Sequence, residues 1–135
     1  MRLAELPPIT NILIIDDIVF DAEVLASTLR LLFGHGIVIR HIRVLREIRK
    51  ALADQLPDVV FLDDRLGHAT PAEVSLGMIQ SSACRDRVIV LSGLLTRVRQ
   101  IELKRLGVAD IVHKDDIDAA RLAEAILKVL DARVP

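Results

Sequence analysis

The chain has 135 residues, enough for one domain with a single hydrophobic core, and 52% of them are hydrophobic, which argues against disorder. Its 18 basic and 19 acidic residues give a net charge of −1, so the overall charge does not indicate binding to nucleic acid or to an anionic membrane. No apolar run approaches the roughly 20 residues of a membrane-spanning helix, and no signal peptide is recognisable. Cys84 is the only cysteine, which excludes an internal disulfide and fits a reducing cytoplasm.

Short apolar runs alternate with amphipathic segments five times along the chain. The first half predicts strands at 12–15, 37–42 and 59–62 and helices at 19–33 and 45–56. In the second half, Thr70-Pro71-Ala72-Glu73 reads as a capping box that begins a third helix. Strands follow at 88–91 and 111–112, with a helix at 95–106 and a last helix capped by Asp115 or Asp116 and ending near Asp131.

This alternation predicts parallel strands joined by right-handed helical crossovers, which make a doubly wound α/β sandwich. The uniformly apolar third strand fits a sheet that is covered on both faces. We expect one domain over residues 11–132, an N-terminal extension over 1–10 and a tail over 133–135.

Polar side chains follow four of the predicted strands, at the edge of a parallel sheet where binding sites form. They are Asp16 and Asp17, Asp63 and Asp64, Ser92, and Lys114. Carboxylates held together repel one another, and a divalent cation such as Mg²⁺ or Mn²⁺ resolves that conflict. Lysine and serine can hold a phosphoryl group, which leaves Asp63 as a carboxylate nucleophile. The set suits phosphoryl transfer to an aspartate.

Asp64 is the alternative to Asp63 if the strand register is displaced by one residue. The alternation of side chains along a strand turns Asp64 away from Asp63, so we expect it to be a solvated loop residue.

The chain resembles the bacterial response-regulator receiver domain of two-component and phosphorelay signalling over 12–130. The resemblance rests on four segments that stand in order: Ile12–Asp17, Pro57–Asp63, Val88–Gly93 and Gly107–Lys114. It implies a five-stranded parallel sheet in a (βα)5 flavodoxin-like sandwich with strand order 2-1-3-4-5.

The resemblance also implies a role for each matching residue. Asp17 would bind Mg²⁺ or Mn²⁺ directly, Asp16 through water, and the Arg65 backbone carbonyl would be a further ligand. Asp63 would be both ligand and phospho-acceptor, and Ser92 and Lys114 would bind the phosphoryl group. Such a protein is a regulatory phospho-acceptor rather than an enzyme. Its phosphodonor would be a histidine kinase or a histidine phosphotransfer protein, and small acyl phosphates would substitute for either.

Three features depart from the family pattern. The first proline after Asp63 is Pro71, eight residues on, where the family often has one after four. Asp115 follows Lys114 where proline is common. The switch position, three before the lysine, is Ile111 rather than an aromatic residue, so an inward-swinging ring cannot provide the readout.

Two further expectations concern the phosphorylated state. Arg65 and Leu94 should border the approach of the hydrolytic water and slow self-dephosphorylation by excluding it. A homodimer through the helix at 95–106, the strand at 111–112 and the last helix is the other expectation.

Other function classes lack their motifs or keep only part of the pattern. A pseudo-receiver, a phosphorylation-independent interaction module, fits the missing aromatic residue but not the complete acidic set. Dehalogenase-type phosphatases need Asp-x-Asp, which Asp63-Asp64-Arg65 does not supply, and nucleotide binders need a glycine-rich loop after the first strand. With no output domain in view, we expect a stand-alone receiver or a part of a longer protein.

Overall fold

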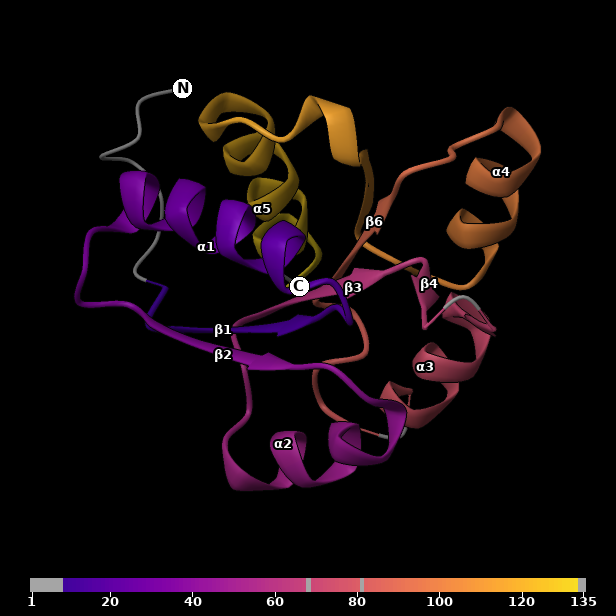
Figure 1. Ribbon diagram of the computed structural model, residues 1–135, viewed down its shortest axis with the longest axis horizontal. Helices are drawn as coiled ribbons and strands as arrows, with labels where there is room; N and C mark the ends of the chain where they lie inside the picture. The colour runs from indigo at the N-terminus through magenta and orange to yellow at the C-terminus, as the bar shows by residue number, and fades with distance from the viewer. Residues whose placement is uncertain (1–8, 68, 81, 134–135) are drawn as a thin grey trace.

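A five-stranded parallel sheet forms the centre of the computed structural model, which describes residues 9–67, 69–80 and 82–133 (Figure 1). Its strands stand in the order β2-β1-β3-β6-β7, which confirms the predicted 2-1-3-4-5 topology. Residues 1–8 of the expected extension and 134–135 of the expected tail lie outside the described ranges. The strands are β1 (Asn11–Ile15), β2 (Val38–Ile42), β3 (Val59–Asp63), β6 (Val88–Ser92) and β7 (Asp110–His113).

Helices cover both faces of the sheet. Figure 1 shows α1 (Val19–Phe33) and α5 (Ala119–Arg133) together on one face. The other face carries α2 (Ile48–Asp54), α3 (Ala72–Ile79) and α4 (Arg97–Arg105). Within the described part of the chain, no helix is both long and apolar enough to cross a membrane.

Two hydrophobic clusters, one on each face, explain why the central strands are apolar throughout. Ile12 and Ile14 of β1 pack with the cluster under α1 and α5, whereas Leu13 and Ile15 pack with the cluster on the opposite face. Alternate side chains of a strand point to opposite faces, so a strand covered on both faces needs apolar residues at every position. The carboxyl ends of the strands are thereby fixed relative to one another.

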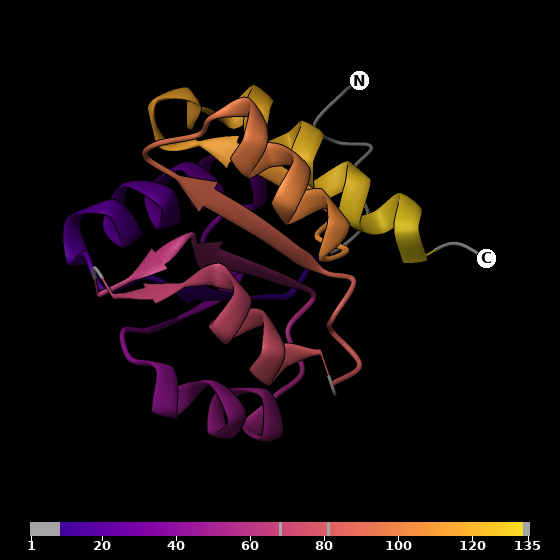
Figure 2. The same ribbon diagram turned by 90° about the vertical axis from the view of Figure 1, so that its right-hand side faces the viewer.

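The predicted capping box before α3 is wrong. Thr70–Pro71 form a short strand, β5, that pairs antiparallel with β4 (Arg65–Leu66), and Figure 2 shows this hairpin leading into α3. The N-cap position is Pro71, which has no side-chain hydrogen bond to the helix. Glu73 is instead bonded to Arg99 of α4. The motif is present in the sequence, but its two polar residues are used elsewhere. Thr70 pairs with Leu66 in the hairpin, and Glu73 binds Arg99.

Other helix boundaries also differ from the predictions. Asp115 and Asp116 lie in a 3-10 turn (Lys114–Asp116), and it is Asp118 that accepts a hydrogen bond from the Arg121 backbone N–H, at 2.7 Å. Helix α5 therefore starts at Ala119, and it continues past Asp131 to Arg133. The segment predicted as a helix at 45–56 divides into a 3-10 turn (Leu45–Glu47) and α2. Helix α4 starts later than predicted, with Thr96 as its cap.

Candidate functional site

Three aspartates meet at the carboxyl edge of the sheet. Asp16 and Asp17 follow β1, and Asp63 ends the neighbouring strand β3. One carboxylate oxygen from each lies within 4.8 Å of the others. Asp16 and Asp63 are almost fully buried, at 2% and 6% exposure. The structure therefore brings together the acidic residues that the sequence predicted to form one site.

The oxygens of Asp16 and Asp17 differ in what they already bind. Asp16 Oδ1 accepts a hydrogen bond from the Ile18 backbone N–H at 2.9 Å, and its Oδ2 accepts one from Lys114 Nζ at 3.3 Å. Asp17 Oδ1 is buried and accepts no hydrogen bond from any described residue. A buried carboxylate oxygen without a donor is costly unless a cation binds it. This oxygen and the hard, all-oxygen character of the cluster fit Mg²⁺ or Mn²⁺.

Burial and charge together change the acidity of Asp63. Removal of its carboxylate from water and the nearby negative charge of Asp16 raise its pKa from 3.8 to about 7. Lys114 Nζ, 3.5 Å from Asp63 Oδ2, and the backbone N–H of Arg65 act in the opposite direction. Without a cation, the cluster therefore keeps a proton on Asp63 up to near neutral pH.

This raised pKa predicts that Asp63 destabilises the metal-free protein. An aspartate with a folded-state pKa of about 7 holds a proton that the unfolded chain releases from about pH 4 upward, so stability falls as the pH rises from 4 to 7. In urea unfolding with EDTA, the free energy of unfolding of Asp63→Asn should exceed that of wild type by roughly 1 to 3 kcal/mol at pH 8 and by almost nothing at pH 4.

The matched control is Asp54→Asn, at an exposed position of α2, which should show no such pH-dependent gain. A stability of Asp63→Asn equal to wild type at pH 8, or a gain that persists at pH 4, would contradict this account of the acidic cluster.

Lys114 joins the cluster from the end of β7. Its ammonium group contacts Asp16, Asp63 and also Asp21, whose Oδ2 is the nearest at 2.8 Å. Burial lowers the pKa of Lys114, but the hydrogen bond to Asp21 and the charges of Asp63 and Asp16 outweigh it, so the pKa is raised. Sequence reasoning missed Asp21, although its place in the first turn of α1, four residues after Asp17, was the available signal.

Ser92 ends β6, but its hydroxyl group points to Asp64. Ser92 Oγ donates to Asp64 Oδ2 at 3.1 Å, and Asp64 is only 5% exposed. The prediction that Asp64 is a solvated loop residue is therefore wrong. Its carboxylate also accepts hydrogen bonds from Arg99 of α4, 35 positions along the chain. That partner lies on another element, so strand alternation alone could not reveal it.

An open cavity of about 410 Å³ lies beside Asp63. Arg65 and Leu94, the two residues expected to shield the site from water, both contribute to its wall, and Leu94 is 77% exposed. Ser92, Asp64 and Arg99 line it as well. The two residues thus line the cavity beside Asp63, and their effect on hydrolysis remains a prediction, as does the role of the Arg65 carbonyl.

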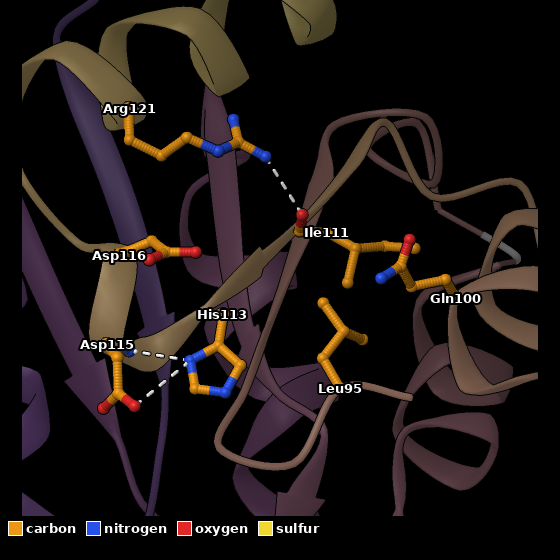
Figure 3. A pocket seen from close by; sticks show the side chains of 7 residues that line it. All are labelled: Leu95, Gln100, Ile111, His113, Asp115, Asp116 and Arg121. Carbon is orange, nitrogen blue, oxygen red and sulfur yellow. Dashed lines mark hydrogen bonds and ion pairs between the residues drawn. The ribbon is translucent and has the colours of Figure 1, made fainter. Parts of the chain in front are cut away.

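Ile111, at the expected switch position, is buried in the hydrophobic cluster that also holds Leu103 of α4. Figure 3 shows a second cavity beside it, of about 510 Å³, between α4, β7 and α5. Arg121 Nη2 donates to the Ile111 carbonyl at 3.0 Å across this region. The other residues that line the cavity are Leu95, Gln100, His113, Asp115 and Asp116.

No described residue follows a cis peptide bond, which fits the presence of Asp115 where the resemblance suggested proline.

The comparisons agree in fold. No family model matches the chain, and no curated protein is significantly similar to it in sequence. Among solved structures, a two-component response regulator from Cytophaga hutchinsonii is 18% identical, with a TM-score of 0.77 over 93% of this chain and 99% of that one. The beryllofluoride-activated receiver domain of RstA from Klebsiella pneumoniae is also 18% identical, with a TM-score of 0.74 over 89% and 98%.

A third match is a response regulator from Burkholderia pseudomallei with a phosphorylated aspartic acid and a calcium ion. It is 18% identical, with a TM-score of 0.73 over 92% of this chain and 71% of that one. At this level of identity the likeness establishes the fold. The chain has the fold of the response-regulator receiver domain, the family that its sequence motifs resemble.

Proposed function

We propose that this chain is a phospho-accepting receiver in which Asp63 takes a phosphoryl group while Mg²⁺ or Mn²⁺ occupies the acidic cluster. The observation that carries the proposal is the joint placement of Asp16, Asp17 and Asp63 within 4.8 Å of one another, with Lys114 3.5 Å from Asp63. A fold alone would not specify a function, whereas this set of groups suits one reaction. The neighbours described as phosphorylated or beryllofluoride-activated support the same assignment.

In the proposed reaction, a carboxylate oxygen of Asp63 attacks the phosphorus atom of the donor. A new P–O bond forms as the bond from phosphorus to the leaving group breaks. The leaving atom is the histidine nitrogen of a kinase or phosphotransfer protein, or the acyl oxygen of a small acyl phosphate. A cation held by Asp16, Asp17 and Asp63 would neutralise charge on the transferred group. Lys114, 3.5 Å from Asp63, would supply a second positive charge, and Ser92 can donate a hydrogen bond.

The distribution of free and occupied oxygens supports a division of roles in metal binding. Asp17 has the buried oxygen without a partner, which suits a direct ligand. Asp16 already uses both oxygens on Ile18 and Lys114, which suits contact through water.

One observation favours the pseudo-receiver as a second candidate: the Ser92 hydroxyl is bonded to Asp64 rather than directed to the acceptor. The two functions separate in one experiment, incubation of the wild-type protein with acetyl phosphate and Mg²⁺ followed by intact-mass spectrometry. A receiver gains one phosphoryl group, and the gain disappears when EDTA removes the cation. A chain that stays unmodified at saturating donor and Mg²⁺ would be a pseudo-receiver.

A further inference from the structure

Arg99 of α4 connects three elements around the switch serine. Its Nε lies 3.1 and 3.2 Å from the two carboxylate oxygens of Asp64, at the end of β3. Its Nη1 and Nη2 contact the two oxygens of Glu73 on α3 at 2.8 and 2.7 Å. Paired carboxylate contacts of this kind fix a guanidinium group in direction as well as distance. We call Asp64, Arg99 and Glu73 the Arg99 bridge.

The bridge is a principal attachment of α4 to the rest of the molecule. Of the residues in this helix, only Leu103, near its carboxyl end, is buried. Val98 and Ile101 are 67% and 45% exposed, and Figure 1 shows α4 at the edge of the molecule. The amino-terminal half of α4 therefore owes its position mainly to Arg99, whose side chain is only 17% exposed. A change at Asp64 should consequently change the position or mobility of this helix.

The Ser92 hydroxyl connects the bridge to the acceptor site. A hydroxyl group has one proton to donate, and Ser92 gives it to Asp64 Oδ2. A phosphoryl oxygen on Asp63 would need the same proton. Both acceptors cannot have it at once, so phosphorylation and the Ser92–Asp64 hydrogen bond oppose each other.

We propose that Asp64 and the phosphoryl group on Asp63 compete for the Ser92 hydroxyl, and that Arg99 transmits the outcome to α3 and α4. This coupling rests on the proposed function, and it supplies a readout in a chain whose switch position is the buried Ile111. In the unmodified state Ser92, Asp64 and Arg99 form one continuous chain of hydrogen bonds. In the phosphorylated state Ser92 leaves the chain, and the loop at 93–96 that leads from it into α4 follows.

The competition has a reciprocal consequence. If binding at the acceptor site breaks the Ser92–Asp64 hydrogen bond, a substitution that weakens this bond must favour binding at the acceptor site. Asp64→Asn removes the negative charge that attracts both Ser92 and Arg99. Arg99→Gln removes the link to the helix and leaves Asp64 in place. The loss of one hydrogen bond to a charged acceptor corresponds to a change of about tenfold to 150-fold in an equilibrium constant.

The experiment combines calorimetric binding of beryllofluoride in the presence of Mg²⁺ with hydrogen-exchange mass spectrometry of the segment at 93–105. In wild type, beryllofluoride should change the exchange of this segment. In Arg99→Gln and Asp64→Asn, exchange should already be fast without beryllofluoride and change little when it binds. Affinity for beryllofluoride should rise about tenfold to 150-fold in Asp64→Asn, which no longer competes as a charged acceptor, and should not rise in Arg99→Gln, where Asp64 still accepts the Ser92 proton. Arg97→Gln, at an exposed position on the same helix, is the matched control and should behave as wild type.

Three outcomes would overturn the coupling. The first is a wild-type response of α4 to beryllofluoride in Arg99→Gln. The second is faster exchange in α4 of Asp64→Asn with no change of its beryllofluoride affinity, because a purely structural bridge would act in that way. The third is the absence of beryllofluoride binding in wild type, which would refute the proposed function and the coupling with it. If Asp64→Asn does not fold, Glu73→Gln weakens the bridge at its exposed end and should give a smaller change in the same direction.

Discussion

Replacing Asp63 with asparagine is expected to remove phosphorylation by acetyl phosphate completely. The amide oxygen of asparagine is a poor nucleophile, and both oxygens of Asp16, the other cluster carboxylate that contacts Lys114, already accept hydrogen bonds. Intact-mass spectrometry after incubation with Mg²⁺ and donor should show one phosphoryl group on wild type and none on the variant. Because Asp63→Asn should be at least as stable as wild type at neutral pH, the loss cannot be attributed to unfolding.

Asp64→Asn is the informative comparison for this result, because Asp64 is the neighbouring buried carboxylate. Its oxygens are occupied by Ser92 and Arg99, so the variant should still accept one phosphoryl group. If the modification survives in Asp63→Asn and disappears in Asp64→Asn, the acceptor is Asp64 and not Asp63, and the proposed assignment of the site is wrong.

The second large effect is expected at the metal site. Asp17→Asn should weaken Mg²⁺ binding about a hundredfold or more, because it removes charge from the one buried carboxylate oxygen that lacks a hydrogen-bond partner among the described residues. Asp16→Asn should weaken it only about tenfold, since both Asp16 oxygens are already hydrogen-bonded within the protein. The chain contains no tryptophan or tyrosine, so isothermal titration calorimetry suits the measurement better than intrinsic fluorescence.

Equal losses in the two variants would contradict the division between a direct ligand and a water-mediated one. Asp115→Asn is a suitable control. Asp115 is 90% exposed and lies outside the acidic cluster, so its replacement should leave Mg²⁺ affinity unchanged.

The sequence predicted the parts of this molecule that depend on local pattern. Apolar strands such as β3 identify a covered parallel sheet, and the residue types at the strand ends identify Asp16, Asp17, Asp63 and Lys114 as one site. Strand order then brings these ends together, because β1 and β3 are neighbours in the sheet. Helix α1 was predicted with its observed limits because its apolar residues recur at helical spacing and a glycine follows its last residue.

The parts that could not be predicted depend on pairs of residues that are remote in sequence. Asp64 is buried because Arg99 reaches it from α4, and no local rule specifies that contact. Glu73 follows the sequence pattern of a capping box, but its charge is attracted to the same arginine, whose hydrogen bonds lower the pKa of Glu73 to about 2. Asp21 is an unremarkable helix-start residue in sequence and becomes part of the site only when β7 places Lys114 beside it.

The contact between Asp21 and Lys114 bears on the order in which the proposed ligands would enter the site. Lys114 contacts three carboxylates, those of Asp16, Asp21 and Asp63, and Asp17 lies beside two of them, so we expect the excess negative charge to repel an anionic phosphodonor. In the proposed function, a divalent cation held by the acidic cluster would offset much of this repulsion, and Lys114 could then exchange Asp21 for a phosphoryl oxygen. We therefore expect sequential entry, with the cation before the donor. A high concentration of donor should then fail to compensate for a lack of cation, which would make the divalent cation a permissive input that precedes the phosphodonor.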